Sequence, residues 1–194
     1  MPADPPPAQF LDVDWSRLPR PEDDGAARHL PGSRVPPVAL SATDGSSVAL
    51  GGLAGRSVVY VYPMTGRPGA DLPDGWDGIP GARGCTPQTC AFRDHHAELI
   101  AAGADRVFGL STQDSEYQRE AAQRLHLPFP LLSDAALRLT TALRLPVMLV
   151  GGATLLQRMA LIIEDGVIAH VFYPVFPPDQ NAAEVLGWLR AQQE

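Results

Sequence analysis

The stretch Gly84-Cys85-Thr86-Pro87-Gln88-Thr89-Cys90 holds both cysteines of the 194-residue chain, five positions apart. It follows a loop rich in glycine and proline, and it opens a segment whose pattern predicts a helix. A thiol at the start of a helix lies where backbone N–H groups and the helix dipole favour negative charge. The thiolate is the nucleophilic form of cysteine. A second thiol five residues on can form a disulfide once the first is oxidised, so the pair predicts a redox site.

Length and charge limit the classes of protein that fit. A chain of 194 residues is long enough for one well-buried core. The net charge of −7 argues against a nucleic-acid or anionic-membrane partner, because both need a basic surface. The apolar stretch 145–163 is interrupted by Gly151-Gly152 and Gln157-Arg158, so we expect it not to span a membrane.

The start of the chain has neither the basic region nor the apolar stretch of an export signal, so we expect a cytoplasmic protein. In a reducing cytosol a disulfide is more often catalytic than structural. We interpret residues 1–33 as a proline-rich N-terminal extension and residues 34–194 as one domain. The apolar side chains expected to pin the extension onto the domain are Phe10, Val13 and Trp15.

Strand and helix signals alternate along the domain. The run 58–62 is continuously apolar and predicts a buried central strand. Hairpins are predicted around Asp44-Gly45 and Asp165-Gly166, the second with strands over 155–163 and 167–173. Further strands are expected at 107–110 and 131–132, and helices at about 85–101, 115–125, 135–143 and 179–192. This order predicts an α/β fold with a mixed sheet.

Two helices have more detailed expectations. In the first, over 85–101, the buried stripe is expected to hold Phe92, Ala97, Ile100 and Ala101. The helix over 135–143 is expected to be capped by Asp134 or Ser133.

At this point the motifs resemble a known family. Residues 84–94 read G-C-T-P-Q-T-C-A-F-R-D, which resembles the G-C-T-x-[EQ]-x-C-x-F-R-D segment of the bacterioferritin comigratory (PrxQ) group of peroxiredoxins, in the AhpC/TSA family. Residues 127–134 are similar to the stretch after that family's second helix, and Asp165-Gly166 fits its late hairpin. The resemblance covers about residues 31–188. It implies a thioredoxin-like fold, a central mixed sheet flanked by helices, and a thiol-specific peroxidase with neither cofactor nor metal.

The resemblance also implies roles for individual residues. Cys85 matches the peroxidatic cysteine and Cys90 the resolving one, joined after oxidation in an intramolecular Cys85–Cys90 disulfide. Arg158 matches the arginine that stabilises the thiolate and the peroxide, and Pro63 the proline that opens and shields the active-site loop. The implied partners are a peroxide, hydrogen peroxide or an organic hydroperoxide, and thioredoxin or a similar dithiol reductant. We expect a monomer, because an intramolecular resolving cysteine needs no partner subunit.

One departure from the family pattern concerns the active-site loop. The family reads P-x-x-x-T-x-x-C, whereas here Pro63 lies 22 residues before Cys85 and Ala82 replaces the threonine. The loop over about 66–84 therefore carries 15 extra residues. We expect Thr65 to supply the hydroxyl if the insertion loops out after it. Residues 69–84 are then expected to act as an added lid that shapes or narrows substrate access.

Simpler interpretations of the same residues remain open. Cys90 is also typical of a buried core cysteine, and a lone arginine such as Arg158 most often forms an ordinary salt bridge. Gln88 either holds the loop by hydrogen bonding or lies on the helix surface. His95-His96 suggests a metal site, but adjacent histidines point to different helix faces and the spacing fits no common zinc motif.

Two other functions compete with the peroxidase. A thiol–disulfide exchange enzyme on the same fold lacks its usual C-x-x-C spacing. A non-enzymatic redox sensor would use the disulfide as a switch. Geometry adds one expectation to the peroxidase: Cα atoms five apart on an intact helix are roughly 8–9 Å apart. A disulfide tolerates about 7 Å, so the first turns must unwind when it forms.

Overall fold

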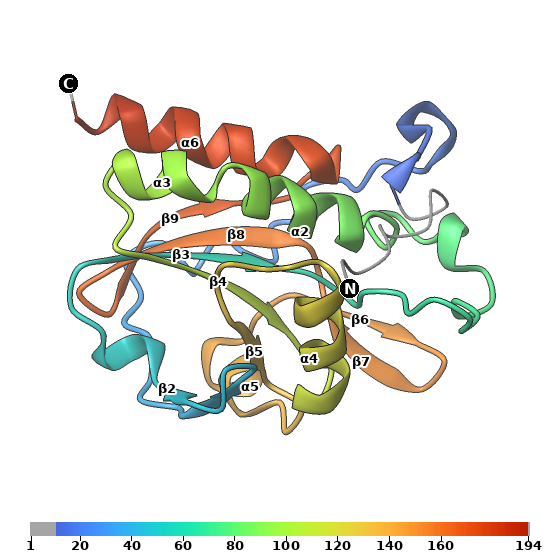
Figure 1. The fold of residues 1–194 in the computed structure, drawn as a ribbon, viewed down its shortest axis with the longest axis horizontal. Helices are drawn as coiled ribbons and strands as arrows, with labels where there is room; N and C mark the ends of the chain where they lie inside the picture. Colours follow the sequence, from blue (N-terminus) through green and yellow to red (C-terminus); the bar gives the residue numbers. More distant parts are fainter. Residues whose placement is uncertain (1–10, 194) are drawn as a thin grey trace.

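The computed structural model describes residues 11–193, so Phe10 and the first proline run lie outside the described residues. Seven strands form one mixed sheet in the order β2-β1-β5-β4-β3-β8-β9 (Figure 1). They are β1 Leu40–Ala42, β2 Ser47–Val48, β3 Arg56–Val61, β4 Arg106–Ser111, β5 Leu131–Ser133, β8 Met159–Glu164 and β9 Val167–Phe172. Two further strands, β6 Val147–Val150 and β7 Ala153–Leu156, form a separate antiparallel pair.

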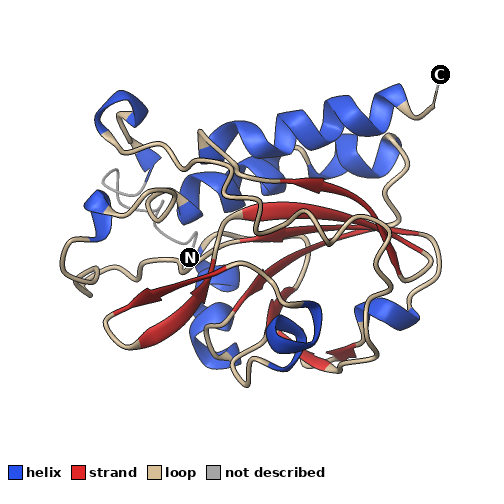
Figure 2. Cartoon of the chain, turned by 180° about the vertical axis from the view of Figure 1, so that it is seen from behind, coloured by secondary structure: helices blue, strands red, loops and turns tan. Residues whose placement is uncertain are grey.

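Helices connect and cover these strands (Figure 2). The α-helices are α2 Cys85–Asp94, α3 His96–Ala101, α4 Ser115–Arg124, α5 Arg138–Leu143 and α6 Asn181–Ala191. The 3-10 turns are η1 Trp15–Arg17, η2 Leu50–Gly52, η3 Trp76–Gly78 and η4 Pro178–Gln180. In residues 11–193 none of the helices has the length and apolar character that a membrane crossing requires.

The predicted α/β fold with a central mixed sheet is confirmed. Strand β3 pairs in parallel with β4 and antiparallel with β8, which places the apolar run 58–61 at the centre of the sheet. Both predicted hairpins form, β1 with β2 and β8 with β9. A strand with both faces covered is apolar throughout, so the sequence of β3 shows no alternation.

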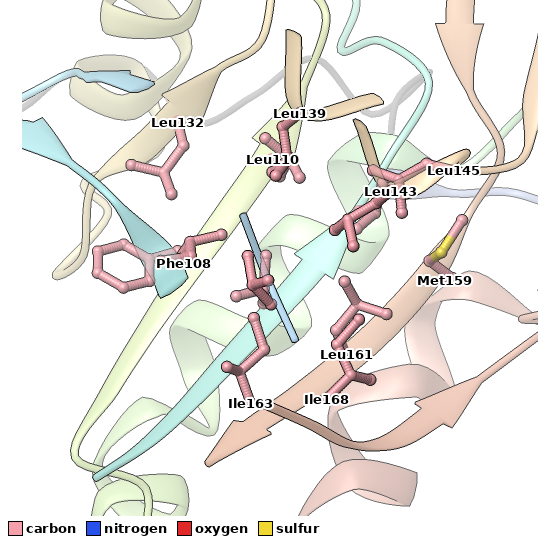
Figure 3. Close-up of a cluster of buried hydrophobic side chains, with 14 of the residues drawn as sticks. Phe108, Leu110, Leu132, Leu139, Leu143, Leu145, Met159, Leu161, Ile163 and Ile168 are labelled. Atoms are coloured by element: carbon pink, nitrogen blue, oxygen red, sulfur yellow. The ribbon is translucent and has the colours of Figure 1, made fainter. Parts of the chain in front are cut away.

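The core lies on both faces of this sheet. Along β3, Val59 and Val61 join a cluster that also holds Leu139 and Leu143 of α5, and Figure 3 shows side chains of that cluster lying over the strands of the sheet. Val58 and Tyr60 point to the opposite face and pack with residues of α2, α3 and α6, the three helices drawn together over the sheet in Figure 1. Helix α2, which begins at Cys85, therefore packs directly on the central strand.

The first helix departs from the predicted continuous span and stripe. It is interrupted at His95, where φ is −91° and ψ is 3°, so that α2 ends at Asp94 and α3 begins at His96. The break changes the phase of the buried face. Residues 97, 100 and 101, expected in the core, are exposed, with Ile100 at 39%. Leu99 and Ala102 are buried instead, while Phe92 is buried as expected.

The predicted strand over 155–163 is also divided. Residues up to Leu156 pair with β6 across the Gly151-Gly152 turn, and residues from Met159 pair with β3. The two residues between, Gln157 and Arg158, belong to neither ladder. The predicted strand is divided here because the Arg158 side chain bonds to groups outside the sheet, described below.

Helix α5 begins at Arg138, three residues later than predicted. Leu137 has φ of +56°, a left-handed conformation that cannot continue a helix. The predicted capping residue is correct in part. Asp134 accepts hydrogen bonds from the backbone N–H groups of Leu139 and Thr140 at 3.1 and 2.7 Å. It therefore caps the helix although it does not directly precede the first helical residue, Arg138.

The N-terminal segment packs against the turn η4 and the residues just before it. Trp15 donates from Nε1 to Oδ2 of Asp179 at 3.1 Å and packs edge-on against Phe176, which confirms that this side chain pins the segment. Val13 is partly buried. Ala27 and Leu30 are buried in the same cluster as the central strand. The division of the chain at residue 33 stays a prediction.

Candidate active site

Cys85 is the first residue of α2 and is buried. Gly84 before it has φ of +110°, a conformation that favours glycine. A Cβ at Gly84 would lie 2.7 Å from Pro178 and 2.8 Å from Trp15. A larger residue would therefore collide with both neighbours, and glycine is what allows the start of α2 to pack so closely beneath them.

Arg158 connects the thiol to the loop in front of it. Its Nη2 lies 3.3 Å from Sγ of Cys85 and donates to the carbonyl oxygens of residues 81–83 at 2.9–3.2 Å. Its Nη1 donates to Oε1 of Gln88 at 2.5 Å. The side chain is only 3% exposed. The resemblance and the structure therefore agree on where this arginine lies.

The charge of Arg158 lies against the sulfur of Cys85 without a carboxylate beside it in the part of the chain that the structure describes. The ion pairs found among residues 11–193 do not include Arg158, so no carboxylate balances this buried charge. A buried charge without a counter-charge is costly. The sulfur of Cys85 lies in contact with the guanidinium, and it also lies at the start of α2, where a helix favours negative charge. The simpler interpretation of Arg158 as a surface salt bridge is thereby ruled out.

Gln88 is the residue that fixes the guanidinium. It is fully buried, its Oε1 accepts from Arg158, and its Nε2 donates to Oδ1 of Asn181 at 3.0 Å. Of the two interpretations of Gln88, the hydrogen-bonding one is confirmed and the surface one is wrong. Asn181, at the start of α6, could not be identified from the sequence, because only the fold brings this residue beside Gln88 of α2.

Cys90 lies on the same helix, one turn and a half along from Cys85, and both thiols are free and buried. Burial raises the pKa of the Cys90 thiol, because the thiolate loses solvation in its apolar surroundings, although nearby Arg93 acts in the opposite direction. The folded form therefore holds the second cysteine as a neutral thiol at neutral pH. The intact helix also keeps the Cα atoms of Cys85 and Cys90 farther apart than a disulfide allows.

This pKa shift is measurable in a Cys85→Ser variant, where Cys90 is the remaining thiol. We expect the thiolate absorbance of the folded variant to develop at higher pH than in the urea-unfolded variant, because unfolding removes the burial. A Cys85→Ser/Cys90→Ser variant subtracts the four tyrosines, which also titrate at high pH. A folded midpoint equal to or below the unfolded midpoint would contradict the burial argument.

A small cavity lies against the thiol. Its volume is about 20 Å³. The helix contributes Cys85, Thr86 and Pro87. The backbone N–H groups of Cys85 and Thr86 belong to the first turn, where they have no partner within the helix, and Pro87 has no N–H. Those N–H groups can bind an oxygen next to the sulfur. The remaining lining residues are Met64, Gly66, Leu72, Trp76, Arg83 and Gly84, most of them from the inserted loop.

Thr65 and Pro63 are both buried close to the start of the inserted loop. Thr65 is buried, and its N–H and hydroxyl both bond to Oε1 of Gln113 at 3.0 and 3.3 Å. Within residues 11–193, no hydrogen bond joins it to Cys85. The hydroxyl role of Thr65 and the shielding role of Pro63, which is buried just after β3, stay predictions. Gln113 was missed because nothing in the sequence marks it.

The histidines beside the cysteines have other roles. His95 bonds through Nδ1 to the carbonyl of Ala91 at 2.9 Å, and the ring of His96 lies near Phe129. In the described part of the chain no three potential metal ligands among His, Cys, Asp and Glu side chains come together.

Comparison with known proteins fits this geometry. The family model described as Redoxin matches residues 30–186. A chloroplastic peroxiredoxin Q of Sedum lineare is 33% identical over 167 residues, which cover 85% of this chain and 80% of that protein. The chain belongs to the redoxin family, in its peroxiredoxin Q group.

Other relatives agree with this membership. The chloroplastic peroxiredoxin Q of Oryza sativa subsp. japonica is 33% identical over 162 residues, 82% of this peroxiredoxin, which spans 66% of the length of the rice protein. Among solved structures, peroxidoxin BcpB from Mycobacterium tuberculosis is 25% identical with a TM-score of 0.66, over 84% of this chain and 98% of that one. The structure of Xylella fastidiosa PrxQ is 19% identical with a TM-score of 0.68. The match covers 86% of this chain and 99% of that one, and it shows the same thioredoxin-like fold.

Proposed function

We propose that this peroxiredoxin is a thiol-specific peroxidase that reduces hydrogen peroxide and organic hydroperoxides through Cys85. The observation that carries the proposal is the 3.3 Å contact between Nη2 of Arg158 and Sγ of Cys85 at the start of α2. A guanidinium and a helix N-terminus acting on one sulfur favour the nucleophilic thiolate. The cavity against that sulfur gives a peroxide a place to bind.

In the first step the thiolate of Cys85 attacks the terminal oxygen of the hydroperoxide. The S–O bond forms as the O–O bond breaks, the sulfur is oxidised by two electrons, and the leaving oxygen takes a proton to become water or an alcohol. Charge develops on that leaving oxygen. We assign its stabilisation to the N–H groups at the start of α2, where residues line the cavity, and to the guanidinium of Arg158, which contacts the sulfur from outside the cavity lining.

In the second step Cys90 attacks the sulfenic acid of Cys85. The S–S bond forms as the S–O bond breaks, and hydroxide leaves and takes up the proton of the thiol, so that one water is released. Both residues lie on the intact helix α2, so its first turns must unwind before the sulfurs meet. Unwinding also exposes Cys90 to solvent, which removes the burial that keeps it protonated.

An external dithiol then returns the enzyme to its reduced form by thiol–disulfide exchange. We assign this role to thioredoxin or a similar protein, acting on a monomer in the cytoplasm. The monomer is supported by the position of both cysteines in one helix of one chain, which lets the disulfide form without a partner subunit.

The test is steady-state consumption of hydrogen peroxide by the purified protein with thioredoxin, thioredoxin reductase and NADPH. The proposal predicts sustained NADPH oxidation that requires both peroxide and this protein. A single oxidation without turnover would favour a redox sensor. Reduction of protein disulfides in the absence of peroxide would favour a thiol–disulfide exchange enzyme. Either result would overturn the peroxidase.

A further inference from the structure

We propose that the inserted loop makes this enzyme selective for small hydroperoxides, with Trp76 as the residue that excludes bulky ones. The inference rests on the proposed function, because it concerns the substrate of the same thiol. It assigns a role to residues 66–84, the segment that departs from the family pattern.

The first argument is the size of the space at the sulfur. A cavity must have a volume of roughly 10–15 Å³ to hold one water molecule. The cavity beside Cys85 has about 20 Å³. Hydrogen peroxide, with two oxygen atoms, is close to that size. The aryl group of a compound such as cumene hydroperoxide has no room in it.

The second argument is a larger hollow that shares part of its lining with the cavity at the thiol. This hollow has a volume of about 350 Å³ and is lined by residues 72–78 and Arg83. Leu72, Trp76 and Arg83 line both this hollow and the small cavity at the thiol. These three side chains form the partition between a space that fits a peroxide group and a space that fits an alkyl or aryl group.

The third argument is that the partition is held in place. Trp76 is 4% exposed and packs in a cluster with Ala82 of the loop and with Val150 and Leu155 of the β6–β7 hairpin. Arg83 forms an ion pair with Asp77 at 3.1 Å. Because these side chains pack against a separate hairpin, we expect the partition to keep its position when a substrate enters. The partition then limits the size of the hydroperoxide that reaches Cys85.

The experiment measures kcat/KM for cumene hydroperoxide and for hydrogen peroxide, and compares their ratio among variants. Trp76→Ala joins the two spaces, so we expect the ratio to rise at least about tenfold, since a change of one methylene in a pocket is already worth about tenfold or more. Ile79→Ala is the matched control. Ile79 packs against the same cluster but lines neither space, so the ratio should stay at the wild-type value.

Leu72→Ala is the second variant, because Leu72 also lines both spaces and is only partly buried. Its ratio should rise as well, and it decides the question if Trp76→Ala does not fold. An unchanged ratio in the folded variants, an equal rise in Ile79→Ala, or a wild type that prefers cumene hydroperoxide would each overturn the inference. Loss of the proposed function has a different signature, because the wild type would then consume neither peroxide.

Discussion

Cys85→Ser is expected to abolish peroxide reduction completely, whereas Cys90→Ser is expected to reduce one equivalent of peroxide and stop. A serine hydroxyl is not ionised at neutral pH, so the contact with Arg158 no longer produces a nucleophile. Without Cys90 the sulfenic acid of Cys85 forms but has no thiol to attack it. Intact mass spectrometry with a sulfenic-acid trap, alongside peroxide consumption, measures both outcomes.

The two variants form a matched pair, because both cysteines are buried in the same helix. If the assignment of roles is reversed, Cys85→Ser will form the single sulfenic acid and Cys90→Ser will be inactive. Sustained turnover by Cys90→Ser with thioredoxin would mean that the reductant attacks the sulfenic acid directly, and would remove Cys90 from the mechanism.

Arg158→Met is expected to slow the first oxidation of Cys85 by about 10²–10³-fold, the usual loss when a group that stabilises the reacting charge is removed. The substitution takes away the only cation in contact with the sulfur among the described residues, and also the donors to the carbonyls of residues 81–83. Stopped-flow measurement of sulfenic acid formation as a function of peroxide concentration separates binding from chemistry.

Two further variants sharpen this prediction. Arg158→Lys keeps the charge but loses the fork that bonds to Gln88 and to the thiol at once, so its rate should lie between those of wild type and Arg158→Met. Arg190→Met removes an arginine whose ion pair with Glu98 is largely exposed, and should have the wild-type rate. A wild-type oxidation rate in folded Arg158→Met would contradict the assigned role.

Much of the fold was predictable because its signals are local. The apolar run of β3 and the Asp-Gly turns of the hairpins are complete within a few residues. The errors arose where a local pattern gave way to a tertiary contact. The break at His95 moved Leu99 into the core in place of Ile100. The division of the predicted strand at Arg158 follows from hydrogen bonds to a loop some 75 residues earlier in the chain.

The candidate site divides in the same way. Cys85, Cys90 and Arg158 were identified because their motifs resemble those of a family, and the structure brings Cys85 and Arg158 into contact. Asn181 and Trp76 were not identified, since an asparagine at a helix start and a tryptophan in a long loop each have many ordinary uses. The fold alone places one beside Gln88 and the other beside the thiol.

The most direct test of the account is peptide mapping by mass spectrometry after the reduced protein is treated with one equivalent of hydrogen peroxide. The account predicts a disulfide between Cys85 and Cys90 within one chain, and its disappearance on addition of reduced thioredoxin. Oxidation of Cys85 that leaves Cys90 a free thiol, or a disulfide found only between two chains, would contradict it.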